Sequence, residues 1–171
     1  MDELKDFAKN LDNIDDFKPW DQSYYFTKLQ KEKFNIDPEM LRPYFKAENV
    51  IKGIFEVANK MYGIEFNELN NIDTWHEEVT TYEVLNEDKS LVGLIYIDLH
   101  PRPTKRSGAW MNSIKDNGMY KGEIRRPHVQ FTANLTRSTK DKPALLTFDE
   151  VETIFHEFGH CLHGLLSDCK Y

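Results

Sequence analysis

Residues 146–168 read LTFDEVETIFHEFGHCLHGLLSD and contain His156-Glu157-Phe158-Gly159-His160, the H-E-x-x-H pattern. On a helix, side chains four residues apart lie on one face, so His156 and His160 can direct imidazole nitrogens at one metal ion. Zinc held by imidazoles lowers the pKa of a bound water to about 7, and a neighbouring carboxylate can accept that water's proton. The pattern therefore predicts two zinc ligands, His156 and His160, with Glu157 as the general base.

The residues around this pattern predict the helix that it requires. Thr147 is a favourable N-cap, and Glu150, three residues later, completes a capping box. Leu146 and Val151 are placed to form a hydrophobic staple across the cap. We therefore expect one active-site helix over residues 147–168.

Apolar side chains repeat at helical spacing along this helix, so one side of it is expected to pack into a core. They are Val151, Ile154, Phe155, Phe158, Leu162, Leu165 and Leu166. His156, His160 and His163 fall roughly opposite them and are expected to face a cleft. His163 is not expected to be a zinc ligand, because it lies about 10 Å along the helix axis from His156.

Length, net charge and the distribution of apolar residues restrict the class of protein to which the chain can belong. The length of 171 residues suits one domain, and the net charge of −7 does not suggest a nucleic-acid partner. No apolar run is long enough to span a membrane, and residues 1–10 do not resemble a signal peptide. We expect a cytoplasmic location, and a periplasmic one stays open because the natural N-terminus is expected to lie further upstream.

The two cysteines do not indicate a disulfide. On one helix, Cys161 and Cys169 would lie about 12 Å apart, too far for a bridge. Cys161 is expected to be a small core residue.

Helical segments are expected before residue 75. They are Leu4–Leu11, then Gln22–Phe34 with Asp21 as its cap and Tyr24, Tyr25, Phe26 and Leu29 as packing residues, a short helix starting at Asp37-Pro38-Glu39, and Glu48–Tyr62 ending at Gly63.

Strands are expected between residues 76 and 146. Val79–Leu85 and Leu91–Leu99 are predicted to form a hairpin, and the second, apolar on both faces, is expected to be central in a sheet. Thr104–Lys121 contains glycine and is expected to be irregular. His128–Thr136 alternates between apolar and polar residues, which predicts a strand with one buried face.

Two interpretations of His128–Thr136 stay open. It is either an ordinary half-exposed edge strand, or an edge that pairs with a peptide substrate and presents Gln130, Thr132 and Asn134 to it.

The basic residues Arg102, Lys105 and Arg106 also have two interpretations. They either bind the C-terminal carboxylate of a substrate, with Arg106 as the candidate ligand, or form ordinary surface ion pairs.

Five motifs resemble the thimet oligopeptidase family of zinc metallopeptidases, which includes oligopeptidase A and peptidyl-dipeptidases. They are Trp20-Asp21-x-x-Tyr24-Tyr25, Leu41–Phe45 (LRPYF), Arg106–Met111 (RSGAWM), Pro143–Leu146 (PALL) and Phe155–Leu166 (FHEFGHCLHGLL). The resemblance implies a cleft-containing peptidase that uses one zinc ion per active site to hydrolyse short, unstructured peptides. It also implies that His156 and His160 are the zinc ligands and that Glu157 is the catalytic glutamate.

The resemblance further implies that something is missing. Members of the family are several times longer and take a third zinc ligand, a glutamate, from a helix further downstream. We therefore expect a mainly helical α+β, zincin-like segment of a larger catalytic domain, inactive alone, with the third ligand supplied by the rest of the parent chain. Its expected parts are helical residues 1–75, a small sheet with loops over 76–146, and the active-site helix 147–168.

The alternative is a non-catalytic α+β module. Such a module would bind zinc weakly, or bind a peptide on the edge strand at Gln130–Thr136.

Overall fold

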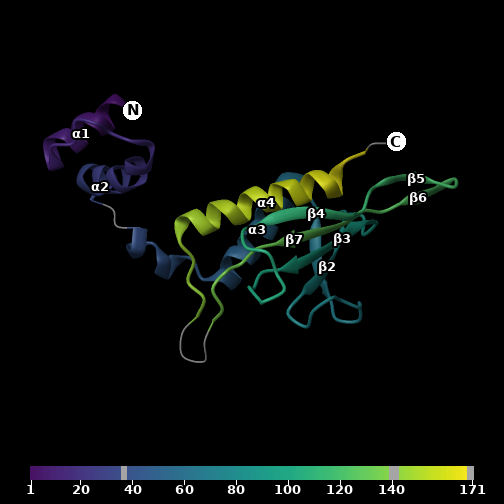
Figure 1. The fold of residues 1–171 in the computed structure, drawn as a ribbon. Coiled ribbons are helices and arrows are strands. Elements are labelled where there is room, and N and C mark those ends of the chain that lie inside the picture. The colour runs from purple at the N-terminus through teal and green to yellow at the C-terminus, as the bar shows by residue number, and fades with distance from the viewer. Residues whose placement is uncertain (36–37, 139–142, 169–171) are drawn as a thin grey trace. The chain divides into compact units, whose positions relative to one another are not determined.

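The computed structural model describes residues 1–35, 38–138 and 143–168, and it divides into two units, Met1–Leu41 and Arg42–Tyr171 (Figure 1). Two expectations involve residues outside this description: the helix cap at Asp37 and the distance between Cys161 and Cys169. The short helix expected near Asp37 is described from Pro38 as a 3-10 turn, Pro38–Met40.

The first unit contains two helices that pack against each other, α1 (Asp2–Asp12) and α2 (Gln22–Phe34). Leu4, Ala8 and Tyr25 form its buried cluster. The Tyr25 hydroxyl also donates a hydrogen bond of 3.0 Å to the carboxylate of Asp12. Both helices are therefore confirmed.

Two details of the first unit differ from expectation. The carboxylate of Asp21 accepts a hydrogen bond of 2.9 Å from the backbone N–H of Lys18 and makes none to α2 as its cap. It closes the 3-10 turn Pro19–Asp21 instead. Tyr24 and Phe26, expected to pack, are half exposed within their unit.

Within the described residues, the second unit forms a mixed sheet with the strand order β1-β2-β3-β7-β4 and a separate ribbon, β5-β6. Strands β3 and β7 run parallel, and the other neighbouring strands run antiparallel. The β2–β3 hairpin and the central position of β3 are confirmed, and the fold is α+β. The strands are Glu65–Leu69 (β1), Thr80–Leu85 (β2), Leu91–Asp98 (β3), Trp110–Lys115 (β4), Gly118–Tyr120 (β5), Glu123–Arg125 (β6) and His128–Thr132 (β7).

Four strands lie where none was expected. Strand β1 lies in residues 1–75, expected to be helical, β4 and β5 lie in Thr104–Lys121, expected to be irregular, and β6 lies just after that segment. The register of β4 shifts between Ser113 and Lys115, which is a bulge against β7. A bulge interrupts the alternation of side chains between faces, so the sequence of β4 lacks the regular period of a strand.

Strand β7 is shorter than expected and is not an edge. It ends at Thr132 instead of Thr136, and it is paired with β3 on one side and β4 on the other. Both interpretations of this strand as an edge are therefore wrong.

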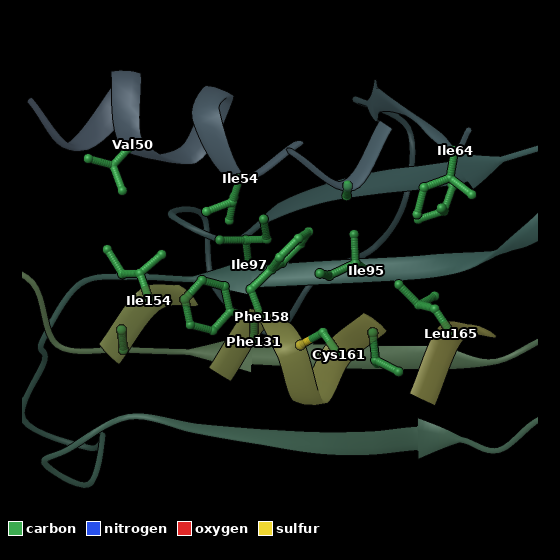
Figure 2. Packing of buried hydrophobic residues seen from close by; sticks show 14 of the residues in the cluster. Val50, Ile54, Ile64, Ile95, Ile97, Phe131, Ile154, Phe158, Cys161 and Leu165 are labelled. Carbon is green, nitrogen blue, oxygen red and sulfur yellow. The ribbon is translucent and has the colours of Figure 1, made fainter. Parts of the chain in front are cut away.

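Helices α3 (Ala47–Tyr62) and α4 (Phe148–Leu166) pack on one face of the sheet, with their apolar side chains directed between them and the strands (Figure 2). The Phe55 and Phe66 rings stack with centroids 4.2 Å apart, and the Phe158 ring packs against both. Helix α3 confirms the expected Glu48–Tyr62 segment and ends at Gly63, which has a φ of 69°. These contacts hold α4 against the sheet.

The chain just before α4 is tied to the start of α3. The backbone N–H of Ala47 donates to the carbonyl of Ala144 at 2.9 Å, and the N–H of Leu146 donates to the carbonyl of Phe45 at 2.8 Å. The beginning of α4 is therefore fixed by backbone hydrogen bonds as well as by its apolar contacts.

Candidate metal centre

The capping box predicted at the start of α4 is present. The Thr147 hydroxyl accepts a hydrogen bond of 3.1 Å from the backbone N–H of Glu150, and the Glu150 carboxylate accepts one of 2.8 Å from the N–H of Thr147. Two N–H groups that have no partner inside the helix are thus satisfied. The helix then runs without a break through the H-E-x-x-H pattern.

The apolar side of α4 is nearly as expected. Its buried residues are Val151, Ile154, Phe158, Cys161 and Leu165, and Leu162 and Leu166 pack beside them. Phe155 is the exception, because it is 42% exposed. It follows Ile154 by one residue, which turns it about 100° away from the buried stripe.

Cys161 is buried and free, as expected for a core residue. Burial, with a smaller effect of the nearby Glu157 carboxylate, raises the pKa of its thiol to about 12. The thiol is therefore protonated at neutral pH and is neither a nucleophile nor a metal ligand in this state.

The exposed side of α4 carries His156, His160 and His163, which confirms their placement opposite the core. The Nε2 atoms of His156 and His160 lie 3.2 Å apart, with ring centroids at 4.8 Å and ring planes at 80°. Two imidazole nitrogens that share a tetrahedral zinc at about 2.0–2.1 Å lie about 3.3–3.4 Å from each other. The pair of side chains thus has the spacing that one zinc ion requires.

An open groove of about 720 Å³, here called the β4 groove, adjoins this pair. Glu157, His160 and His163 line it from α4, and Ala109–Met111 and Asn117 line it from the chain around β4. His156 opens on a neighbouring hollow that Glu157 also lines. Glu157 therefore lines both the β4 groove and the hollow beside His156, and its side chain is within reach of a ligand in the groove.

A second cavity, of about 430 Å³, lies between α3 and the ends of β2 and β3. It is more enclosed, but His156, Glu157 and His160 do not line it. Of the two, only the β4 groove is therefore lined by residues of the H-E-x-x-H pattern.

A third metal ligand does not accompany the two histidines in the part of the chain that the structure describes. No group of three or more His, Cys, Asp or Glu side chains gathers there with metal-binding geometry. His156 and His160 as ligands and Glu157 as base stay predictions that the geometry fits.

The side chains predicted to contact substrate in residues 130–134 are engaged within the protein. The Gln130 amide donates to the Thr132 hydroxyl at 2.7 Å, and Thr132 is fully buried. The Asn134 amide donates to the carbonyls of Arg106 at 2.9 Å and Gly108 at 2.6 Å. None of the three predicted residues lines the β4 groove.

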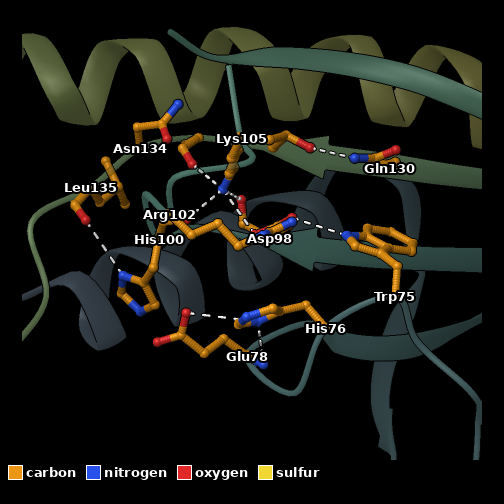
Figure 3. A network of polar contacts seen from close by, with 12 residues as sticks. Trp75, His76, Glu78, Asp98, His100, Arg102, Lys105, Gln130, Asn134 and Leu135 are labelled. Atoms are coloured by element: carbon orange, nitrogen blue, oxygen red, sulfur yellow. Dashed lines mark hydrogen bonds and ion pairs between the residues drawn. The ribbon is translucent and has the colours of Figure 1, made fainter. Parts of the chain in front are cut away.

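Two of the three basic residues predicted to bind a carboxylate are bound to Asp98 (Figure 3). Arg102 makes two hydrogen bonds to the Asp98 carboxylate, of 2.9 and 2.8 Å, and Lys105 makes one of 2.8 Å. The side chains of Asp98 and Lys105 are only 1% and 3% exposed, so surface ion pairing is also wrong for this pair. Arg106 is exposed, and its guanidinium lies 4.6 Å from the centre of the Trp110 ring.

Burial raises the pKa of the Asp98 carboxyl, but the hydrogen bonds from Arg102, Lys105 and Trp75 outweigh it and hold that pKa well below its ordinary value. Burial lowers the pKa of Lys105, and the Asp98 carboxylate opposes that shift. Asp98 is therefore a fixed negative charge that satisfies the two cations.

The groove wall formed by Ala109–Met111 was missed from the sequence. These residues belong to the RSGAWM motif, which resembles a motif of the peptidase family but does not by itself indicate a groove. Their place beside Glu157 depends on the pairing of β4 with β7, which no local sequence pattern predicts.

No described helix has the length and apolar character needed to cross a membrane.

Comparison with known proteins identifies relatives along the whole chain. The family described as Peptidase family M3 matches residues 1–171. Oligopeptidase A of Escherichia coli is 40% identical over 166 residues, which cover 96% of this chain and 24% of that protein. Oligopeptidase A of Haemophilus influenzae is 37% identical, covering 98% and 25%, and the dipeptidyl carboxypeptidase of E. coli is 36% identical, covering 90% and 22%. The chain thus spans about a quarter of the length of these relatives.

Proposed function

This chain belongs to peptidase family M3, and from that premise we propose that it carries two zinc ligands and the general base of a metallopeptidase. His156 and His160 bind the metal ion, and Glu157 assists hydrolysis of the peptide bond. The observation that carries the proposal is the 3.2 Å separation of the two Nε2 atoms on the exposed side of α4.

Each residue has a distinct task. The two imidazoles would hold the cation, and Glu157 would accept a proton from the attacking water and pass it to the leaving amine. A zinc ion bound there supplies a Lewis acid that makes water a nucleophile at neutral pH. The capping box and the apolar side of α4 keep the three side chains in register.

The third zinc ligand is proposed to come from outside the described residues. Catalytic zinc usually has three protein ligands, and about three quarters of the length of the matching relatives lies outside the matched region. We expect the remainder of a parent chain to supply a carboxylate and to complete a zincin-like site. The segment alone is then inactive.

The substrate proposed is a short peptide, in keeping with the names oligopeptidase A and dipeptidyl carboxypeptidase of the relatives. It would lie in the β4 groove. In the described part of the sheet, β4 is paired only with β7, so its other side is available to an extended peptide backbone. This moves the expected strand pairing from β7 to β4. The cytoplasm is the proposed location.

Calorimetric titration with zinc tests the metal site. The wild-type chain should bind one ion, and His156→Ala and His160→Ala should each abolish saturation in the same concentration range. His163→Ala is the matched control, because His163 lies on the same side of α4 and should leave the affinity nearly unchanged. Undiminished zinc affinity in both of the first two variants would refute the site.

A further inference from the structure

The loop that leads into β4 is tied to the neighbouring strands by the buried ammonium group of Lys105 (Figure 3). The Nζ atom of Lys105 lies 2.8 Å from both the carbonyl and a carboxylate oxygen of Asp98, 2.9 Å from the carbonyl of His100 and 2.6 Å from the carbonyl of Ala133. An ammonium group has three N–H donors, so these four oxygens satisfy it completely. Lys105 therefore connects the end of β3, the loop that follows β3 and the chain that leaves β7.

Asn134 holds the next residues of the same loop. Its amide nitrogen donates one hydrogen bond to the carbonyl of Arg106 and another to the carbonyl of Gly108. Both N–H groups of the amide are thus used on one loop. Gly108 has a φ of 95°, a conformation that glycine adopts without strain.

These contacts end where the β4 groove begins. Residues 105–109 belong to no helix or strand, Ala109 lines the groove, and β4 starts at Trp110. A loop without regular hydrogen bonding depends on side chains to fix its backbone. The chain that Asn134 holds is therefore the chain that sets where Ala109 stands relative to Glu157, while Trp110 and Met111 are held by pairing with β7.

We propose that Asn134 is a positioning residue, which with the buried Lys105 fixes the loop of residues 106–109 and thereby places Ala109, at the start of the β4-groove wall opposite Glu157. The catalytic part of this proposal rests on the function proposed above. Asn134 acts through the loop: it does not line the groove itself.

Asn134 lies outside the hydrophobic core, so its effect on the loop can be distinguished from an effect on core packing. Its side chain is not part of the buried cluster, so truncating it opens no cavity in the core. Its two hydrogen bonds go only to the carbonyls of Arg106 and Gly108. Removing them should loosen the loop and leave the sheet and α4 as they are.

Backbone ¹⁵N relaxation tests the proposal without any metal or substrate. In the wild-type chain the amides of residues 106–109 should have order parameters of about 0.85, and in Asn134→Ala they should fall below about 0.6, while Trp110 and Met111, which pair with β7, keep theirs. Residues 156–160 should keep their values in both. Asn134→Asp, which keeps the size of the side chain and loses its N–H donors, should behave like Asn134→Ala.

Asn86→Ala is the matched control. The Asn86 amide also holds a loop, donating to the Ser90 hydroxyl at 2.9 Å in the β2–β3 turn, which does not line the groove. It should leave residues 106–109 rigid. Unchanged order parameters in Asn134→Ala, or a loss of order spread equally over β7 and α4, would overturn the proposal.

Cobalt(II) added to the same samples reports the position of the wall. Bound between His156 and His160, it should produce pseudocontact shifts at the amides of residues 106–111, and Asn134→Ala should change those of residues 106–109 while those within β4 and α4 stay the same. Identical shifts at residues 106–109 in both proteins would overturn the positioning role. Absence of cobalt binding at the two histidines would instead count against the proposed function, and the relaxation data would still decide the role of Asn134.

Discussion

Gly164 lies so close to Met111 that a Cβ atom built on Gly164 would come within 2.8 Å of the Met111 Cε atom. The same Cβ would come within 3.1 Å of Val129 Cγ1, in the buried part of β7. Helix α4 therefore approaches the sheet as closely as it does because residue 164 has no side chain. At Gly159, inside the H-E-x-x-H pattern, a Cβ atom would have no described atom within 4 Å other than those of its chain neighbours and of the adjacent backbone of α4.

These two glycines should respond to alanine in opposite directions. Gly159→Ala should stabilise this chain by about 0.5–1 kcal/mol, because alanine favours a helix and meets no neighbour. Gly164→Ala should destabilise it by about 1–3 kcal/mol through overpacking against Val129, since the tip of Met111 can move aside and Val129 cannot. Urea unfolding measures both, and equal effects of one sign would contradict this difference in packing.

Replacement of Lys105 by methionine should be strongly destabilising. It leaves the buried carboxylate of Asp98 short of one cation, and breaking a buried ion pair costs about 3–5 kcal/mol. Lys89→Met is the control, because Lys89 pairs with Glu65 at 2.6 Å through side chains that are 62% and 41% exposed. It should change the free energy of unfolding by about 0–1 kcal/mol. Similar losses in the two variants would show that burial of the Asp98 pair has no energetic importance.

Asp98 should make the chain sensitive to acid. Its pKa in the folded state lies below the ordinary value of 3.8, so unfolded chains take up a proton before folded ones as the pH falls. Its contribution is complete above about pH 4 and is lost progressively below it. The free energy of unfolding of Asp98→Asn, lower at neutral pH, should therefore decline less steeply over this range. Parallel curves for the two proteins would contradict the depressed pKa.

Glu157→Gln should separate metal binding from catalysis. In an active enzyme that contains this segment, peptide hydrolysis should fall about 10²–10⁴-fold, because the amide cannot accept the proton of the attacking water. Zinc content should stay the same, since His156 and His160 are intact. Turnover near that of the wild type, with zinc confirmed, would remove Glu157 from the proposed mechanism.

The 171-residue chain by itself should bind zinc more weakly than a version extended to include a third ligand, and should not cleave peptides. Two imidazoles leave at least two coordination positions to water. Calorimetry on both forms and a fluorogenic peptide assay measure the difference. Equally tight binding in both would place the third ligand within these residues.

Helix α4 could be predicted from the sequence because everything that specifies it is local. The cap at Thr147, its partner Glu150 and the apolar spacing from Val151 to Leu165 lie within one short stretch. The sides on which the histidines and the core residues fall follow from helix geometry alone. Phe155 was expected on the buried side of the helix and is exposed, because a side chain at the border of the apolar stripe can fall on either side of it.

The sheet and the groove were harder to predict because the strands that pair, and the residues that line the groove, are distant from one another in sequence. Trp110 is paired with Thr132, and the bulge in β4 hides the alternation that would announce a strand. The buried role of Lys105 was missed although one signal existed: Asp98 is the single acidic residue in the apolar strand Leu91–Asp98. A buried carboxylate requires cations or hydrogen-bond donors, and the nearby Arg102 and Lys105 were the obvious candidates.

The parallel pairing of β3 with β7 has an evolutionary consequence. Parallel neighbours cannot be joined by a tight turn, so the chain makes one long excursion over residues 99–127 before it returns beside β3. The β5-β6 ribbon lies at the far part of this excursion and pairs only with itself in the described structure. Because added loop length costs little free energy, insertions and deletions in the ribbon can accumulate without disturbing α4. The ribbon can therefore change in length while His156 and His160 keep their places on α4.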